Sequence, residues 1–220
     1  VPDEYRIENS IKVNESLIQG QGQGFKAWLI PGIAAMAIMQ TGLFTVVFSL
    51  VRFKSQGVLR RLKATPIGAA HFLAGQLTTK VIVVVIQTYV LVIVGALVLG
   101  VTVNTGRLDA WFDLTVLALL GGALFIAMGL AISGWAKSEE TAAPMANVIS
   151  MPMMFLSGVF FPLSVMPDWL TRWSQYLPLT YLADGMRAIT VEGATVTTLG
   201  NELLGLTLWI LVVFTIATKT

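Results

Sequence analysis

Few residues of this chain could carry out chemistry. The sequence has no cysteine, which excludes disulfides and thiolate metal sites. Its one histidine, His71, would need carboxylates beside it to bind a metal. Serines are present, but His71 falls in a loop, so no Ser–His pair can form inside the apolar segments. The nucleotide-binding motif Gly-x-x-x-x-Gly-Lys-Ser/Thr does not occur either. We therefore expect no catalytic, metal or cofactor site in this chain.

The composition indicates an integral membrane protein. Apolar residues make up 55% of the 220 residues, charged residues only 12%, and the mean hydropathy is +0.78. Soluble domains carry roughly 25% charged residues, so this chain lies outside that class. A nucleic-acid-binding surface is not expected, because the basic residues fall mainly in one loop between apolar stretches.

The apolar stretches predict transmembrane helices. A helix needs about 20 mostly apolar residues to cross a hydrocarbon core of about 30 Å. Four stretches reach this length without any Asp, Glu, Lys or Arg, and a fifth is shorter. Because lipid offers the backbone no hydrogen-bond partner, we expect helices rather than strands. The predicted fold is an all-α polytopic membrane protein with five spans, at residues 28–51, 81–103, 114–136, 142–163 and 203–218.

The basic residues predict the orientation of these spans. The loop 52–80 holds six Lys or Arg residues and no acid, which places it in the cytoplasm. Alternation then puts residues 1–27, 104–113 and 164–202 outside. An outside amino terminus predicts a further transmembrane helix ahead of Val1.

Residues 1–27 are predicted to be the tail of an external domain followed by a linker. Apolar positions alternate along residues 1–18, which is compatible with a strand. The Gln-Gly repeat of residues 19–24 precedes a membrane helix, so a flexible linker is favoured over a phosphate-binding loop.

Residues 57–66 of the basic loop form the most informative polar segment. Apolar residues at helical spacing alternate with bases, which predicts a short amphipathic helix at the membrane surface, ended by Thr65-Pro66. These charges could serve only to fix the topology and contact anionic headgroups. They could also dock a soluble partner, and the residues alone leave both interpretations open.

The fourth predicted span and the segment after it should be irregular. Pro152 lies in the middle of the span and should kink it, while Gly158 and Pro162 favour an interrupted or re-entrant end. The stretch 167–182 is rich in Trp and Tyr, which settle at the headgroup level. Short helices along the outer interface are expected there.

The spans contain polar residues but no charged ones. Transporters that couple to ions usually keep a charged residue in the membrane, so a partner that supplies energy, or a passive role, is favoured. The polar side chains could line a translocation pathway or hydrogen-bond neighbouring helices. Small residues Gly121, Gly122 and Gly129 predict close helix packing, within the chain or across a dimer. The pathway candidates are Gln40, Thr45, Gln87 and Asn147.

Four segments together resemble one family, the ABC-2 type permeases, which are membrane subunits of ATP-driven exporters. They are Ile30-Pro31-Gly32-Ile33, the run Gly57 to Ile67, the run Phe155 to Leu163 with Met166-Pro167, and Leu177-Pro178-Leu179-Thr180-Tyr181 with Asp184-Gly185 and Arg187. They cover nearly the whole chain in the order and spacing of the family. The chain departs from the common pattern at residues 53–56.

The resemblance implies a transmembrane domain at residues 28–220, with six helices per subunit. It also implies a homo- or heterodimer of permeases in a prokaryotic cytoplasmic membrane, bound to two ATPase subunits that hold the ATP and Mg²⁺. The basic loop would be the coupling helix that docks the ATPase, through Gly57, Leu59, Arg60, Arg61, Leu62, Lys63, Thr65 and Pro66. An external gate would comprise Ser157, Gly158, Phe160, Phe161, Pro162, Pro178, Thr180 and Tyr181.

The function implied is export of a substrate by alternating access, driven by a separate ATPase. The alternative is a membrane scaffold or small channel, and an intramembrane enzyme comes last for want of reactive groups. An uncharged pathway suits amphiphilic or hydrophobic substrates, but the sequence does not identify the transported molecule.

Overall fold

The computed structural model describes residues 3–58, 69–99, 108–136, 138–163 and 166–219, and these residues form helices and no strand. In chain order the helices are α1 (Asp3–Ser55), α3 (Ala69–Leu99), α4 (Leu108–Trp135), α5 (Glu139–Leu156), α6 (Asp168–Ser174), α7 (Pro178–Thr190), the 3₁₀ turn η2 (Val196–Thr198) and α8 (Gly200–Lys219). The predicted all-α class is confirmed for this part of the chain.

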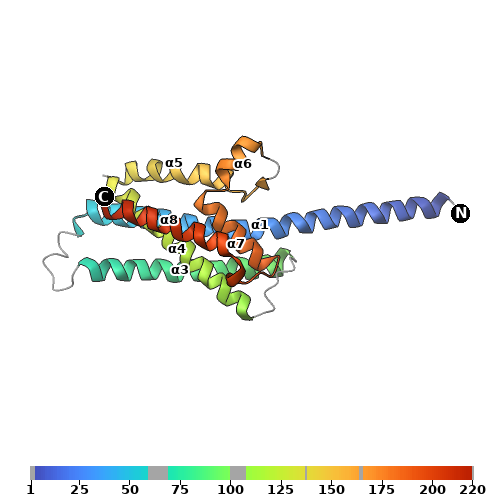
Figure 1. Ribbon diagram of the computed structural model, residues 1–220, viewed down its shortest axis with the longest axis horizontal. Coiled ribbons are helices and arrows are strands. Elements are labelled where there is room, and N and C mark those ends of the chain that lie inside the picture. Colours follow the sequence, from blue (N-terminus) through green and yellow to red (C-terminus); the bar gives the residue numbers. More distant parts are fainter. Residues whose placement is uncertain (1–2, 59–68, 100–107, 137, 164–165, 220) are drawn as a thin grey trace.

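Helix α1 is continuous over 53 residues, and its amino-terminal part extends well beyond the other helices (Figure 1). The strand and the flexible linker predicted within residues 1–27 are therefore wrong as secondary structure. Extending an existing helix needs no new nucleation, so residues that precede an apolar span can continue it at little cost. Whether this part belongs to an external domain stays a prediction.

Four helices are long and apolar enough to cross a membrane, at Gly24–Ser55, Ala74–Val98, Asp109–Trp135 and Gly200–Thr218. They correspond to four of the five predicted spans. The second begins earlier than the predicted residue 81, because α3 starts at Ala69 and includes Lys80. These four helices indicate that the chain is an integral membrane protein.

Helix α5 is the predicted span that does not meet this standard. Ser138 starts it with a capping box, and it ends at Leu156, ahead of Gly158 with its φ of +68°. Its 18 residues give a length of about 27 Å, slightly less than the hydrocarbon core of about 30 Å. The interruption predicted at Gly158 is confirmed, whereas the five-span count stays a prediction.

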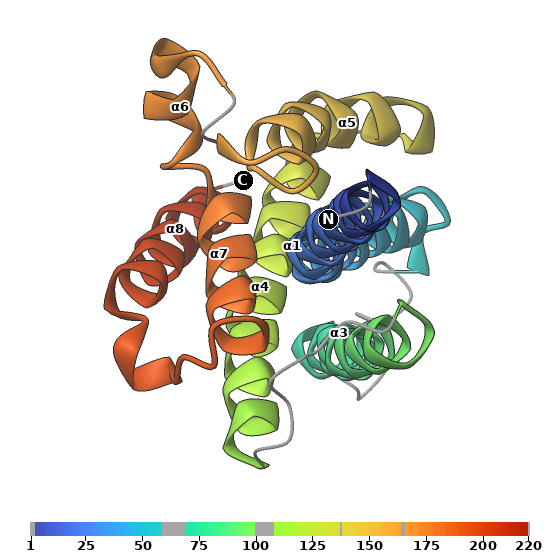
Figure 2. The same cartoon turned by 90° about the vertical axis from the view of Figure 1, so that its right-hand side faces the viewer.

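The helices form a bundle with α4 inside it (Figure 2). Helix α4 contacts α1, α3, α7 and α8, and it is apolar on every side, as expected for a central helix. Apolar side chains of α3 and α8 that face away from the bundle are suited to lipid. They include Ile82, Ile86, Val90, Val94 and Leu97 of α3, and Leu204, Leu208, Leu211 and Phe214 of α8.

The two ends of the bundle differ in chemistry. The carboxyl ends of α1, α4 and α8 and the amino ends of α3 and α5 lie together (Figure 1). We call this the basic end, because Arg52 and Lys54 close α1 there. The opposite end, which holds α6 with its exposed Trp169, Trp173 and Tyr176, is called the aromatic end.

Short interfacial helices were predicted within residues 167–182, where the structure has α6 and the start of α7, and of these only α6 is exposed. Helix α7 is buried along most of its length, from Pro178 to Thr190. It packs on α1, α4 and α8 because it carries small and apolar residues on most of its faces. The prediction of a superficial helix is therefore wrong for α7.

Glycines set the spacing between α1 and α4, which confirms that the predicted small-residue packing occurs within this chain. A Cβ at Gly129 would lie 2.8 Å from the backbone oxygen of Leu43, and one at Gly42 would lie 2.8 Å from Phe125 Cβ. A Cβ at Gly121 would lie 2.6 Å from a terminal methyl group of Leu182 in α7. The helices approach as closely as only glycine permits.

Replacement of Gly129 by alanine should therefore destabilise the bundle, by about 1–3 kcal/mol, because the backbone of α1 would have to move. The matched control is Gly75→Ala in α3, where no atom lies within 4 Å of the added Cβ and alanine favours the helix. Thermal unfolding in detergent measures both. Equal midpoints for Gly129→Ala and wild type would contradict the packing described.

Helix α5 is expected to cross the membrane despite its length, because its two ends lie toward opposite ends of the bundle (Figure 1). Since the chain has no cysteine, single-cysteine variants report cleanly. Glu140→Cys in the first turn of α5 and Thr198→Cys ahead of α8 should react with an impermeant maleimide from opposite sides of a sealed vesicle. Labelling from the same side would show that α5 does not cross.

Candidate functional site

Arg187 of α7 joins three parts of the bundle at the aromatic end. Its Nη1 donates to Asp184 Oδ1 at 2.8 Å, its Nη2 to the Gly158 carbonyl at 2.6 Å, and its Nε to the Trp28 carbonyl at 3.3 Å. The guanidinium also lies 3.7 Å from the centroid of the Trp28 ring, a cation–π distance. Trp28, Gly32, Gly158, Asp184 and Arg187 are called the Arg187 cluster below.

The sequence of α7 explains how this arginine is held. Proline at position 178 starts the helix at a position that needs no backbone donor. Asp184 and Arg187 are three residues apart, so their side chains lie on the same face. The planar guanidinium presents several donors in fixed directions, which allows it to serve two carbonyls and a carboxylate together.

Burial governs the electrostatics of the pair. The Arg187 side chain is 6% exposed and that of Asp184 is 43% exposed. Partial burial raises the pKa of Asp184 above its ordinary value, although Arg187 beside it acts in the opposite direction. Burial likewise lowers the pKa of Arg187, and Asp184 opposes that shift. Because its pKa is raised, acidification neutralises Asp184 before it neutralises a fully solvated aspartate.

Two glycines make room for the cluster. A Cβ at Gly32 of α1 would lie 3.0 Å from Arg187 Nη2 and 3.0 Å from the Val159 carbonyl. Gly158 has a φ of +68°, a left-handed conformation that other residues adopt only with strain. The turn at Gly158 presents its carbonyl to Arg187, immediately after α5 ends.

The predicted external gate draws on the turn after α5 and on α7. Ser157 and Gly158 are buried, and Gly158 belongs to the Arg187 cluster, whereas Phe161 is 57% exposed. Thr180 is buried and donates to the Ser174 carbonyl at 2.7 Å, which fixes the turn between α6 and α7. Phe160 packs against the core and Pro162 is half-buried.

The remaining gate residues belong to α7. Pro178 is buried at the start of that helix. Tyr181 lies against α8, where a Cβ at Gly205 would be 2.6 Å from its ring. The predicted gate residues therefore come from the turn after α5 and from the start of α7, and both the gate and the re-entrant character of the region stay predictions.

Two of the predicted pathway residues, Thr45 and Gln87, each form a hydrogen bond with Thr41 of α1. Thr41 of α1 donates to Gln87 Oε1 of α3 at 2.8 Å, and Thr45 donates to the Thr41 carbonyl. The Nε2 of Gln87 is buried without a hydrogen-bond partner. Gln40 and Asn147 are half-buried, and neither joins this group. These contacts fit the interhelical role at least as well as a pathway.

A polar hollow of about 550 Å³ opens near the basic end. Three helices contribute charged residues to it: α1 with Arg52, α3 with Lys80 and α5 with Glu139. The other lining residues are Phe48, Ser49, Phe53, Gln56 and Gln76. We call it the basic-end hollow.

Most of the predicted docking residues lie outside the part of the chain that the structure describes. Leu59, Arg60, Arg61, Leu62, Lys63, Thr65 and Pro66 fall there. Gly57 is described and has a φ of +67°, so the chain turns sharply after α1. The basic-end hollow is lined by Arg52 and Gln56 among others, and Gln56 directly precedes this turn.

Sequence reasoning missed the Arg187 cluster. The spacing of Asp184 and Arg187 is visible in the sequence, but both fall in the segment 164–202, which was predicted to lie outside the membrane. Trp28 and Gly158 are remote from Arg187 in sequence, so no local pattern could have joined them. Among the described residues, no group of three or more His, Asp and Glu side chains could hold a metal ion.

The chain matches a family model described as ABC-2 family transporter protein over residues 3–219. A Bacillus subtilis (strain 168) protein named as a transport permease, YvfS, is 24% identical over 163 residues, which are 74% of this chain and 65% of the relative. A protein of Escherichia coli (strain K12) named as a multidrug ABC transporter permease, YbhR, is 24% identical over 194 residues, which are 88% of this chain and 50% of the relative.

A second Escherichia coli (strain K12) relative carries the name inner membrane transport permease YadH. It is 23% identical over 166 residues, which are 76% of this chain and 63% of the relative. This chain thus spans between 50% and 65% of the length of these three relatives.

Substitution of Arg187 by methionine should lower the free energy of unfolding by about 2–4 kcal/mol, because two carbonyls and Asp184 lose their donor. Asp184→Asn should cost less, since its amide can still accept a hydrogen bond. Lys26→Met, at an exposed cation near Trp28, is the control and should stay within about 0.5 kcal/mol of wild type. Thermal unfolding in detergent provides the measurement, and equal effects of Arg187→Met and Lys26→Met would refute the role of the cluster.

Proposed function

The chain belongs to the ABC-2 family of transporter proteins, and we propose that it is the membrane permease subunit of an ATP-binding-cassette exporter. The observation that carries this proposal is the match over residues 3–219, which coincides with a bundle of four helices able to cross a membrane. Substrate would leave the cytoplasm by alternating access, and a separate ATPase subunit would bind and hydrolyse ATP.

The direction of transport and the substrate class are inferred from one relative and from the composition of the spans. One relative is named as a multidrug permease, which favours outward movement of amphiphilic or hydrophobic molecules here. The four predicted span segments whose helices qualify as membrane spans hold no charged residue, which suits such molecules. A protein of this kind would act with a second permease copy in a cytoplasmic membrane.

The basic end is the place where the ATPase would dock. The positive-inside rule supports a cytoplasmic location for this end, because it borders the Lys- and Arg-rich segment between α1 and α3. The basic-end hollow is lined by α1, α3 and α5 together, so a partner that pressed there would act on three helices at once.

Alternating access requires that ATP binding stabilise one state of the bundle relative to the other. At the aromatic end, the contacts of the Arg187 cluster would have to hold in one of these two states and break in the other. It joins α1 to α7 and to the turn after α5 through one side chain. The predicted pathway residues Gln40, Thr45, Gln87 and Asn147 would be exposed to substrate in one of the two states.

The test begins with affinity purification of the full-length protein from its native membrane in mild detergent. We expect a chain with a nucleotide-binding Gly-x-x-x-x-Gly-Lys-Ser/Thr motif to co-purify in stoichiometric amount. No such partner under these conditions would overturn the exporter proposal in favour of a membrane scaffold or small channel.

Charge reversal then tests the docking surface. Arg60→Glu with Arg61→Glu should lower the recovery of the ATPase about tenfold and uncouple ATP hydrolysis from transport. Arg52→Glu with Lys80→Glu tests the basic-end hollow in the same assay. The matched control reverses two cations predicted on the other side, Lys26 and Arg107, and should leave recovery unchanged. Wild-type recovery with both test variants would exclude docking at this end.

A further inference from the structure

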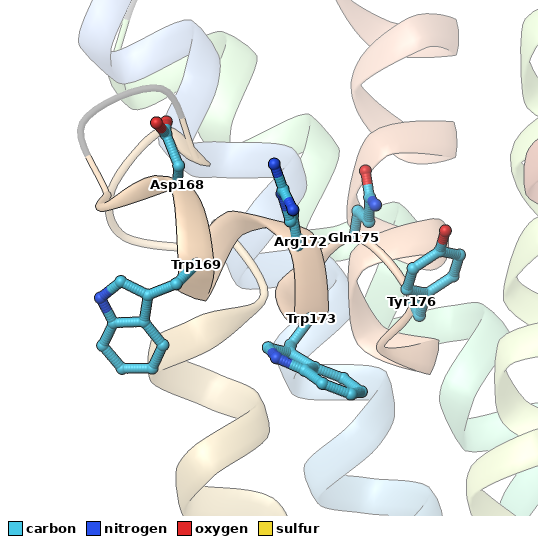
Figure 3. Close-up of a pocket in the computed structure, with 6 residues that line it drawn as sticks. All are labelled: Asp168, Trp169, Arg172, Trp173, Gln175 and Tyr176. Carbon is cyan, nitrogen blue, oxygen red and sulfur yellow. The ribbon is translucent and has the colours of Figure 1, made fainter.

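The outer face of α6 forms a wide hollow at the aromatic end. It has a volume of about 990 Å³ and is lined by Asp168, Trp169, Arg172, Trp173, Gln175 and Tyr176 (Figure 3). We call it the α6 hollow. Its aromatic residues are largely exposed: Trp169 by 67%, Trp173 by 74% and Tyr176 by 60%.

Polar and aromatic side chains separate on this face. Figure 3 shows Asp168, Arg172 and Gln175 pointing to one side of the helix, and Trp169 and Trp173 pointing to the other. Residues four apart on a helix lie above one another, so the spacing of 168 with 172, and of 169 with 173, produces these two rows. A helix of this kind is suited to lie in the membrane–water interface.

The opposite face of α6 is fixed to the protein. Ser174 is fully buried, and Thr171 donates to the Leu163 carbonyl at 3.2 Å. Just after the helix, Trp209 of α8 donates from Nε1 to the Tyr176 carbonyl at 2.8 Å. The orientation of the open face is therefore determined by contacts with the rest of the chain.

Among the residues that the structure describes, no partner is seen for the two charged side chains of the open face. Asp168 and Arg172 are one turn apart and both exposed, yet the part of the chain that the structure describes contains no ion pair between them. Opposite charges at this spacing often pair on a helix. Here they remain available as a cation and an anion held side by side above two aromatic rings.

We propose that the α6 hollow binds the headgroup of a zwitterionic phospholipid, with the phosphate on Arg172 and the ammonium on Asp168. Guanidinium groups bind phosphate through strong, charge-assisted hydrogen bonds. Trp169 and Trp173 lie where the glycerol and upper acyl chains would be, a level that tryptophan prefers. The proposal requires that the chain lie in a membrane, but it does not depend on the transported molecule or on the ATPase.

Photo-crosslinking tests the site in the intact protein. Full-length protein is reconstituted in phosphatidylglycerol nanodiscs that contain a small fraction of phosphatidylethanolamine with a photoactivatable group near the glycerol. After illumination, peptide mass spectrometry should place the main adduct within residues 168–176. Adducts spread evenly over α3, α8 and α6 would overturn the proposal, because they would indicate ordinary lipid contact.

Competition and substitution identify the chemistry. Unlabelled phosphatidylethanolamine should displace the probe, while additional phosphatidylglycerol, which has the phosphate but no ammonium, should compete at least fivefold less well. Equal competition by the two lipids would refute the zwitterion pairing. Soluble phosphoethanolamine at millimolar concentration should not compete, and full displacement by it would assign the site to a soluble ligand instead.

Arg172→Gln and Asp168→Asn should each reduce the α6 adduct about fivefold to tenfold, since each removes one charge-assisted contact. Lys26→Gln, which removes an exposed cation of α1, should leave the adduct unchanged. The unfolding midpoint of each variant confirms that the bundle is intact, as expected for exposed positions. An undiminished adduct in folded Arg172→Gln would overturn the assignment.

Discussion

The packing at the aromatic end of this bundle depends on one guanidinium group, that of Arg187. A helix end leaves backbone carbonyls without partners, and such carbonyls are costly wherever water is excluded. Helix α5 ends short at Leu156, and the Gly158 carbonyl that follows is satisfied by Arg187. The same side chain reaches α1 at Trp28. Removal of this group would leave the Gly158 carbonyl and the Trp28 carbonyl of α1 without their shared hydrogen-bond donor.

Other features of the fold follow from this contact. Gly32 must lack a side chain, because Arg187 and Val159 occupy the space beside it. Gly158 must adopt a left-handed conformation so that its carbonyl faces inward. Helix α7 must be buried rather than superficial, since otherwise Arg187 could not contact α1. Asp184 balances the charge while keeping part of its surface in water.

The sequence predicted those parts of the fold that depend on local composition. Apolar length placed four of the membrane helices, and the glycines of α4 correctly indicated close packing. Residues 1–27 were misjudged, because a short alternating pattern and a Gln-Gly repeat outweighed the tendency of the α1 span to extend as helix. The Arg187 cluster could not be predicted, since Arg187 and Trp28 are separated by 159 residues. A buried arginine and an exposed one look alike until the fold brings their partners together.

Helix α1 gives the two ends of the bundle a mechanical connection. It runs without interruption from Trp28 in the Arg187 cluster to Arg52 in the basic-end hollow, a distance of about 36 Å at the rise of an α-helix. A continuous helix transmits displacement along its axis, so pressure at the basic end would reach Trp28. The Arg187 contacts would then either break or carry α7 and the end of α5 with them. Because these contacts involve one side chain and two carbonyls, they can exist in a joined or a separated state. Under the proposed function, the ATPase would shift the Arg187 contacts between these two states and so open the bundle at the aromatic end.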